Sequence, residues 1–243
     1  MLREYRALVD KVTVFTDAVT ARRGADLSCR AGCASCCYAW LTVSAVEAAP
    51  LREALAQLPA DERARVRARG VEELLREGRG DAPARCAMLG DDERCVVYQG
   101  RPLVCRTQGH ALRYPPGFIP EAAIARKSAN GEETWCPLNY DAAEPNGEDV
   151  LDAERVDQIL AVVSARYLAR TPEGVQRPLA RTPERVHGHD LAQESECRPG
   201  EDFGSHASGR ASTQRFGISE IAAEEDVPND QTARGAPLEA TDG

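Results

Sequence analysis

The cysteines constrain this chain more than any other feature. The 243 residues include nine cysteines, and four of them fall within residues 29–37, which read Cys-Arg-Ala-Gly-Cys-Ala-Ser-Cys-Cys. Four more lie between residues 86 and 136, and Cys197 stands alone. A single cysteine is usually a small buried hydrophobe. Crowding of this kind instead indicates a disulfide framework, a thiol redox site or a metal site.

The compartment decides among these three readings. The first residues, Met-Leu-Arg-Glu-Tyr-Arg, contain no apolar segment typical of a secretory signal. No apolar run approaches the roughly 20 residues that span a bilayer. The sequence therefore predicts a cytoplasmic protein without a membrane partner. Because cytoplasmic thiols are kept reduced, a dense cysteine pattern there favours metal binding over disulfides.

The charge of the chain argues against one class of partner, and its distribution distinguishes the last 73 residues from the rest. The net charge of −9 is unfavourable for phosphate contacts, so nucleic acid is not an expected partner. Residues 171–243 carry 14 acidic and seven basic side chains, and their large apolar residues are isolated. Such a segment buries too little surface to offset its ordering entropy. We predict a metal-binding domain over 1–170 and a largely disordered acidic tail over 171–243, which has a short helix at 214–225 and offers a surface for a protein partner.

Apolar spacing predicts a mainly α fold with a small β-hairpin, an irregular α+β arrangement in which helices pack around a cysteine-ligated metal centre. Tyr5, Leu8, Val12, Phe15 and Val19 have the spacing of one helical face, which Gly24 should end. Three further helices are expected, one starting near residue 44 and the others over 61–77 and 150–169. Residues 85–98 predict the hairpin, and residues 107–148 are expected to be loop-rich.

Two residues mark the second helix. Ser44 and Glu47 have capping-box spacing, and Pro50 should bend or split the helix. Glu47 could instead be a metal ligand, although capping explains it sufficiently. Farther along, Pro102 suits the first position of a short helical turn that would carry Cys105.

The clustered cysteines form the expected ligand set. Tetrahedral sulfur sites suit zinc or an iron–sulfur cluster, and ligand thiols must be deprotonated. Adjacent cysteines diverge in extended backbone, so Cys36 and Cys37 are expected to serve two sites. The spacing leaves the metal and the division of the ligands open. The predicted metal ligands are Cys29, Cys33, Cys36, Cys37, Cys86, Cys95, Cys105 and Cys136.

Several arginines lie near these cysteines. Four thiolates around one divalent ion leave a charge of about −2, which guanidinium groups can offset. Arg101 and Arg106 are the best candidates, and Tyr98 is expected to pack in the core or to hydrogen-bond near a thiolate. His110 could replace a cysteine ligand, but a surface position is the better explanation. The nearby arginines are Arg30, Arg85, Arg94, Arg101 and Arg106.

Three motifs resemble a known family. The first is Cys-x3-Cys-x2-Cys-Cys with Glu47 ten residues on, and the second is Cys86-Ala-Met-Leu. The third, Cys95-Val-Val-Tyr-Gln-Gly-Arg-Pro-Leu-Val-Cys105-Arg, resembles the Cys-x-x-Tyr-x-x-Arg-Pro-x-x-Cys-Arg block of the YkgJ-type cysteine-cluster family at every fixed position. A later cysteine, Cys136, also fits, while the three-residue gap after Cys29 departs from the usual two. The resemblance covers roughly 25–140 and implies chelation of zinc or iron.

The reaction stays open. The protein is expected to be a metal-binding protein or an enzyme that uses an iron–sulfur centre for redox or methyl-transfer chemistry. A disulfide framework and a redox pair at Cys33 and Cys36 are less consistent with the compartment and the surrounding pattern. The first three cysteines also match the radical-SAM spacing, but a helix precedes them and no large parallel barrel is expected to follow.

Overall fold

The computed structural model describes residues 2–115, 126–128, 132–171 and 215–224. The chain divides into two compact units. Unit 1 comprises Met1–Leu27, Val43–Glu47 and Leu103–Arg215, and unit 2 comprises Ser28–Thr42, Ala48–Pro102 and Phe216–Gly243. Helices predominate and the sheets are small, so the predicted fold class is confirmed. None of the described helices is both long enough and apolar enough to cross a bilayer.

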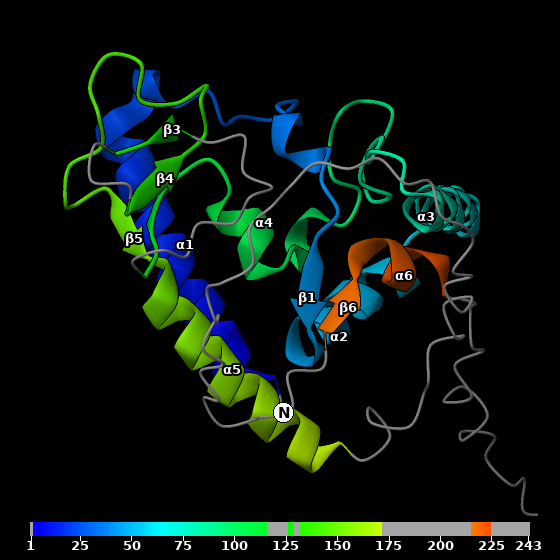
Figure 1. The fold of residues 1–243 in the computed structure, drawn as a ribbon. Helices are drawn as coiled ribbons and strands as arrows, with labels where there is room; N and C mark the ends of the chain where they lie inside the picture. The colour runs from blue at the N-terminus through cyan, green and yellow to red at the C-terminus, as the bar shows by residue number, and fades with distance from the viewer. Residues whose placement is uncertain (1, 116–125, 129–131, 172–214, 225–243) are drawn as a thin grey trace, which may run out of the picture. The chain divides into compact units, whose positions relative to one another are not determined.

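The helices of unit 1 bury the apolar stripes that the sequence predicts. α1 (Arg3–Arg23) ends at Gly24, whose φ of 20° lies in a region that few other residues adopt. α5 (Ala153–Arg170) begins at Asp152, whose side chain accepts the Arg155 amide hydrogen and caps the helix. α1 and α5 lie side by side in Figure 1, and α4 (Leu103–Thr107) also contacts α1. Their shared core contains Tyr5, Leu8, Val12, Val46, Leu103, Leu160 and Val163.

Unit 1 also contains a four-stranded sheet that the sequence does not predict. Its strands lie in the order β3 (Arg126–Lys127), β4 (Glu133–Trp135), β2 (Ala111–Arg113) and β5 (Val150–Asp152). β2 pairs antiparallel with β4 and parallel with β5. A second core packs here, formed by Val19, Ala111, Trp135, Tyr140 and Val150. The expectation of a loop-rich 107–148 is wrong at these strands, because strands of two or three residues are too short for a visible alternation.

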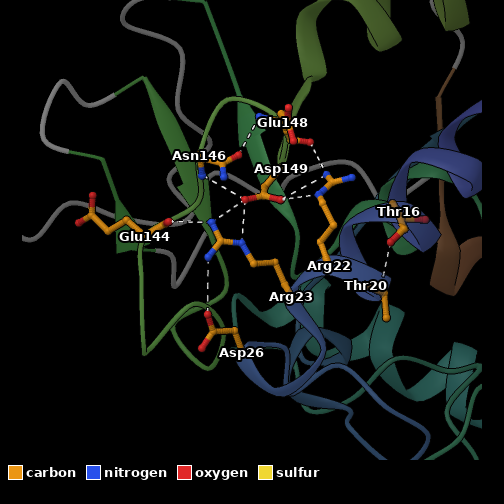
Figure 2. Close-up of polar contacts among 9 residues, drawn as sticks. All are labelled: Thr16, Thr20, Arg22, Arg23, Asp26, Glu144, Asn146, Glu148 and Asp149. Atoms are coloured by element: carbon orange, nitrogen blue, oxygen red, sulfur yellow. Dashed lines mark hydrogen bonds and ion pairs between the residues drawn. The ribbon is translucent and has the colours of Figure 1, made fainter.

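A buried carboxylate joins the end of α1 to the loop before β5 in unit 1 (Figure 2). Asp149 is fully buried and lies between Arg22 and Arg23. The Arg23 Nη2 and Asp149 Oδ2 atoms are 2.6 Å apart, and the Arg22 Nη2 and Asp149 Oδ1 atoms are 3.3 Å apart. The Asn146 amide donates to the same carboxylate at 3.1 Å. Burial opposes the charge of Asp149, but these donors outweigh burial and lower its pKa.

The second helix, α2 (Ala45–Ala56), confirms the predicted cap. The Ser44 amide and hydroxyl donate to the Glu47 carboxylate at 2.9 and 2.8 Å. The prediction that Pro50 splits the helix is wrong, since α2 continues through it. A proline removes one amide donor while its φ still suits a helix. Before α2 the chain forms β1 (Thr42–Ser44), which pairs with β6 (Arg215–Gly217).

Unit 2 is built on α3 (Ala60–Arg79), which ends at Gly80 with a φ of 75°. Its buried residues are Val66, Gly70 and Glu73, while the apolar Val71 and Leu75 are exposed. α6 (Ile218–Ala223) packs against α3, which confirms the helix predicted within 214–225. Arg52 forms an ion pair with Glu224 at 2.5 Å and lies over the Phe216 ring. The rest of the predicted tail lies outside the described residues, so the predicted boundary at 170 stays a prediction.

Gly70 sets the approach of α6 to α3, and this gives a testable prediction. A Cβ on residue 70 would lie 2.7 Å from the Ala222 Cβ and 2.8 Å from the Ala223 nitrogen. We expect Gly70→Ala to displace α6 and to speed hydrogen exchange in residues 215–224. Gly78→Ala is the matched control, because a Cβ there meets open space and should stabilise the helix by about 1 kcal/mol. Unchanged exchange of 215–224 in Gly70→Ala would contradict the packing.

Candidate metal site

The first cysteine segment is a series of tight turns in unit 2. The Cys33 amide donates to the Arg30 carbonyl at 2.9 Å, and Gly32 within this turn has a φ of 88°. A short 3-10 helix, η2 (Ser35–Cys37), follows, and the Cys37 amide donates to the Ala34 carbonyl at 2.8 Å. The Cys86 amide donates to the Cys37 carbonyl at 2.6 Å. This bond places the second cysteine segment directly beside the first.

The second segment forms a small turn that carries Cys86 and Cys95. The predicted hairpin is present in reduced form, as a single antiparallel bridge between Leu89 and Cys95. The Val96 amide donates to the Met88 carbonyl at 2.9 Å. The backbone also donates to both sulfurs, from the residue two positions on in each case: Met88 to Cys86 and Val97 to Cys95. Such donors stabilise sulfur as a thiolate, the form in which it binds a metal.

In unit 2 the simultaneous deprotonation of Cys36, Cys86 and Cys95 is electrostatically unfavourable. Burial, together with the charges of Cys95 and Cys36, raises the pKa of Cys86 to about 11, against the opposing effects of the Met88 amide and Arg69. Burial also raises the pKa of Cys95. Because like charges oppose one another at these sulfurs, deprotonating them together requires a cation nearby.

Cys36 and Cys37 correct one expectation. Their side chains do not diverge toward two sites, because the backbone is a 3-10 turn and not extended. The two thiols share a hydrogen bond, which is the main cause of the strongly raised pKa of Cys36, and burial adds to it. The two sulfurs are therefore close enough to act in one site.

Of the predicted arginines, Arg101 is supported as a partner of sulfur. Its charge lowers the pKa of both Cys36 and Cys95. Its guanidinium carbon lies 3.6 Å from the centre of the Tyr98 ring. Tyr98 is 55% exposed, so the expectation of core packing is wrong, and it serves as a platform for Arg101. Arg85 has a structural contact instead, donating to the Leu89 and Gly90 carbonyls at 2.9 and 2.6 Å.

Sequence reasoning missed Glu73, which connects both cysteine segments to α3. Its Oε2 atom accepts the Trp40 indole hydrogen and the Ala84 amide hydrogen, both at 3.2 Å. Trp40 follows the first segment and Ala84 precedes Cys86, so one carboxylate positions both. The available signal was its spacing, since Glu73 shares the helical face of Val66 and Gly70.

Unit 1 contains Cys105 and Cys136. Cys105 lies on α4, as the turn predicted after Pro102 requires. Glu47 accepts the Leu103 amide at 3.0 Å through Oε1, while its Oε2 caps α2. Both oxygens are thus occupied, which favours the capping interpretation over a ligand role. The buried Tyr5 hydroxyl has no hydrogen-bond partner among the described residues, and burial followed by the Glu47 charge raises its pKa, although Arg106 opposes them.

His110 is another residue that the sequence misplaced. The expectation of a surface position is wrong, because the residue is only 8% exposed. Burial lowers its pKa, and its Nδ1 atom has no hydrogen-bond partner in the described part of the chain. Cys136 directly follows β4, and its carbonyl accepts the Asn139 amide at 3.0 Å. Asn139 also donates to the Gly109 carbonyl at 2.7 Å, which holds the chain next to His110.

The donor chemistry fits a thiolate-bound metal, but the ligand sphere is not closed. None of the eight described cysteines forms a disulfide. Over residues 2–115, 126–128, 132–171 and 215–224, no three His, Cys, Asp or Glu side chains are gathered closely enough to hold an ion. Backbone donors and neighbouring thiols are nevertheless in place at Cys36, Cys86 and Cys95.

A comparison with protein families finds a match to this segment. Residues 28–137 match the CxxCxxCC family. The family is described as "Putative zinc- or iron-chelating domain". The match to CxxCxxCC begins one residue before Cys29 and ends one residue after Cys136, so it contains all eight predicted ligands and confirms the resemblance. No curated protein and no solved structure matches the chain.

Proposed function

We propose that the protein chelates zinc or iron through cysteine thiolates of its CxxCxxCC segment. The observation that carries the proposal is the 2.6 Å hydrogen bond from the Cys86 amide to the Cys37 carbonyl, which places the turn that carries Cys86 and Cys95 beside the first cysteine segment. Within that segment, the Cys37 thiol shares a hydrogen bond with that of Cys36. We propose the full set of eight predicted ligands, and these four are its best-supported members.

The chain contributes the positions of the sulfurs and part of the charge balance. Backbone amides donate to Cys86 and Cys95, Arg101 offsets negative charge, and Glu73 holds the two segments on α3. A bound divalent ion would supply the positive charge that keeps the thiols deprotonated. Since the ligand sphere is open in the described structure, we expect metal binding to complete the folding of these turns.

Anaerobic purification with metal analysis tests the proposal. We expect zinc or iron at a fixed ratio to protein, retained through gel filtration and released by acid. Iron with acid-labile sulfide and visible colour would identify an iron–sulfur cluster, and zinc without colour would identify a zinc site. Cys197→Ser should leave the metal content unchanged, because this cysteine lies outside the family segment. Protein that binds neither metal, before and after reconstitution, would overturn the proposal.

A further inference from the structure

Unit 2 contains a pocket beside Cys95 that metal chelation does not explain. Its volume is about 490 Å³, within the range of pockets that hold small molecules. One wall is the first half of α3 and the other is the turn between the two cysteines of the second segment. The lining residues are Glu62, Arg65, Arg69, Gly90, Asp91, Asp92, Arg94, Cys95 and Val96.

The basic side of this pocket has one guanidinium without a counter-ion. Arg69 is half-buried, and its Nε donates to the Ala87 carbonyl at 2.9 Å. Among the described residues, no carboxylate forms an ion pair with it. Burial, followed by the like charge of Arg85, lowers its pKa, and the negative charge of Asp91 opposes them only in part. A negative group near its remaining N–H donors would relieve both effects.

The acidic residues of the lining are mostly occupied. Asp92 accepts the Arg94 amide at 3.1 Å, and Asp91 lies 3.7 Å from the Arg85 guanidinium with its side chain 87% exposed. These two carboxylates stabilise the turn at the solvent side. Arg94 contributes a second guanidinium, whose Nε atom forms a long, exposed ion pair with Asp92 at 4.0 Å. The lining thus has three guanidinium and three carboxylate groups, and two of the carboxylates, those of Asp91 and Asp92, already have amide or guanidinium partners.

We propose that this pocket binds a small oxyanion, the carboxylate or phosphate group of a small molecule, through Arg69 and Arg94. Guanidinium groups are suited to both because their planar donors match two oxygens at once. The bound anion would lie next to Cys95, on the α3 side of the proposed metal site. This binding uses residues other than the proposed ligands, so it is measured separately from metal content.

Calorimetry on the full chain, as purified, tests this inference with inorganic phosphate and with malonate at constant ionic strength. We expect saturable binding of at least one probe, weakened about tenfold by Arg69→Gln, since a charged hydrogen bond is lost. Arg94→Gln should weaken it similarly and serves if Arg69→Gln fails to fold. Arg79→Gln, on the same helix but outside the lining, should leave binding unchanged.

A charge-sign test separates an anion site from a cation site. Glu62→Gln should strengthen anion binding, because it removes a negative charge from the lining. Binding of phosphate alone would identify a phosphoryl group as the natural ligand, and binding of malonate alone a carboxylate. Failure of both probes, equal loss in Arg79→Gln, or weaker binding in Glu62→Gln would overturn the inference. Metal content measured on the same samples shows separately whether the proposed chelation holds.

Discussion

Replacing Cys86 and Cys95 together by serine is expected to lower metal affinity by roughly a hundredfold or more, since even residues outside the ligand sphere affect it 10- to 100-fold. Both sulfurs accept backbone amides, and the charge of Cys95 raises the pKa of Cys86, so they belong to one group. A hydroxyl has almost the same size as a thiol but binds zinc and iron poorly at neutral pH. Competition with a chromophoric chelator measures the affinity.

The same variant is expected to lose stability as well as metal. Metal binding and folding are coupled where the ligands come from loops. A chelator should therefore lower the melting temperature of the parent protein and have little effect on the double variant. Cys197→Ser controls for the loss of a thiol as such. A double variant with full metal content and an unchanged response to the chelator would show that the metal binds elsewhere.

Asp149→Asn is expected to cost about 3 kcal/mol of unfolding free energy at neutral pH, because breaking a buried ion pair leaves charged partners unpaired. The Asp149 side chain is 1% exposed, and Arg23 beside it is 16% exposed. Asp61→Asn is a matched control: its pair with Arg65 is exposed on both sides and should matter little. Urea unfolding of all three proteins at pH 7 gives the comparison.

The pH dependence of this difference follows from the lowered pKa of Asp149. A carboxyl whose pKa is lower in the native state stabilises the fold above the unfolded value, which is about 3.9. That contribution is present at pH 7 and is lost as the pH falls below about 4 through the native-state pKa. The parent and Asp149→Asn should therefore converge in acid. A difference that stays constant down to pH 3 would contradict the role assigned to the charge.

Patterns that repeat along the chain predicted the helices well. α1 and α3 follow from apolar spacing and from glycines at their ends, and the cap of α2 follows from Ser44 and Glu47. The four-stranded sheet depends on pairing between distant segments, such as β2 with β5, and strands this short leave no periodic signal. Pro50 does not split α2, because the helix tolerates the loss of one amide donor.

In the candidate site, too, some residues can be found from local motifs, and others depend on contacts between distant segments. Motif spacing selected the cysteines and Arg101 as candidates, because ligand chemistry restricts residue type, and their roles at a metal stay a prediction. Glu73 and Asp149 could not be distinguished from the many solvent-exposed acidic residues, since their roles come from partners far away in the sequence. The expectation for Cys36 and Cys37 fails because adjacent side chains diverge only in extended backbone, whereas η2 brings their thiols together.

The docking of α6 on α3 has a consequence for biosynthesis. Residues 216–224 belong to unit 2 and carry the helix that packs on α3, although the cysteines of that unit are synthesised far earlier. A nascent chain emerging from the ribosome therefore carries these cysteines on a unit that lacks α6 until residue 224 has left the exit tunnel. Domains generally fold as units during synthesis. Stable metal insertion should accordingly follow, and not accompany, translation of the cysteine segments.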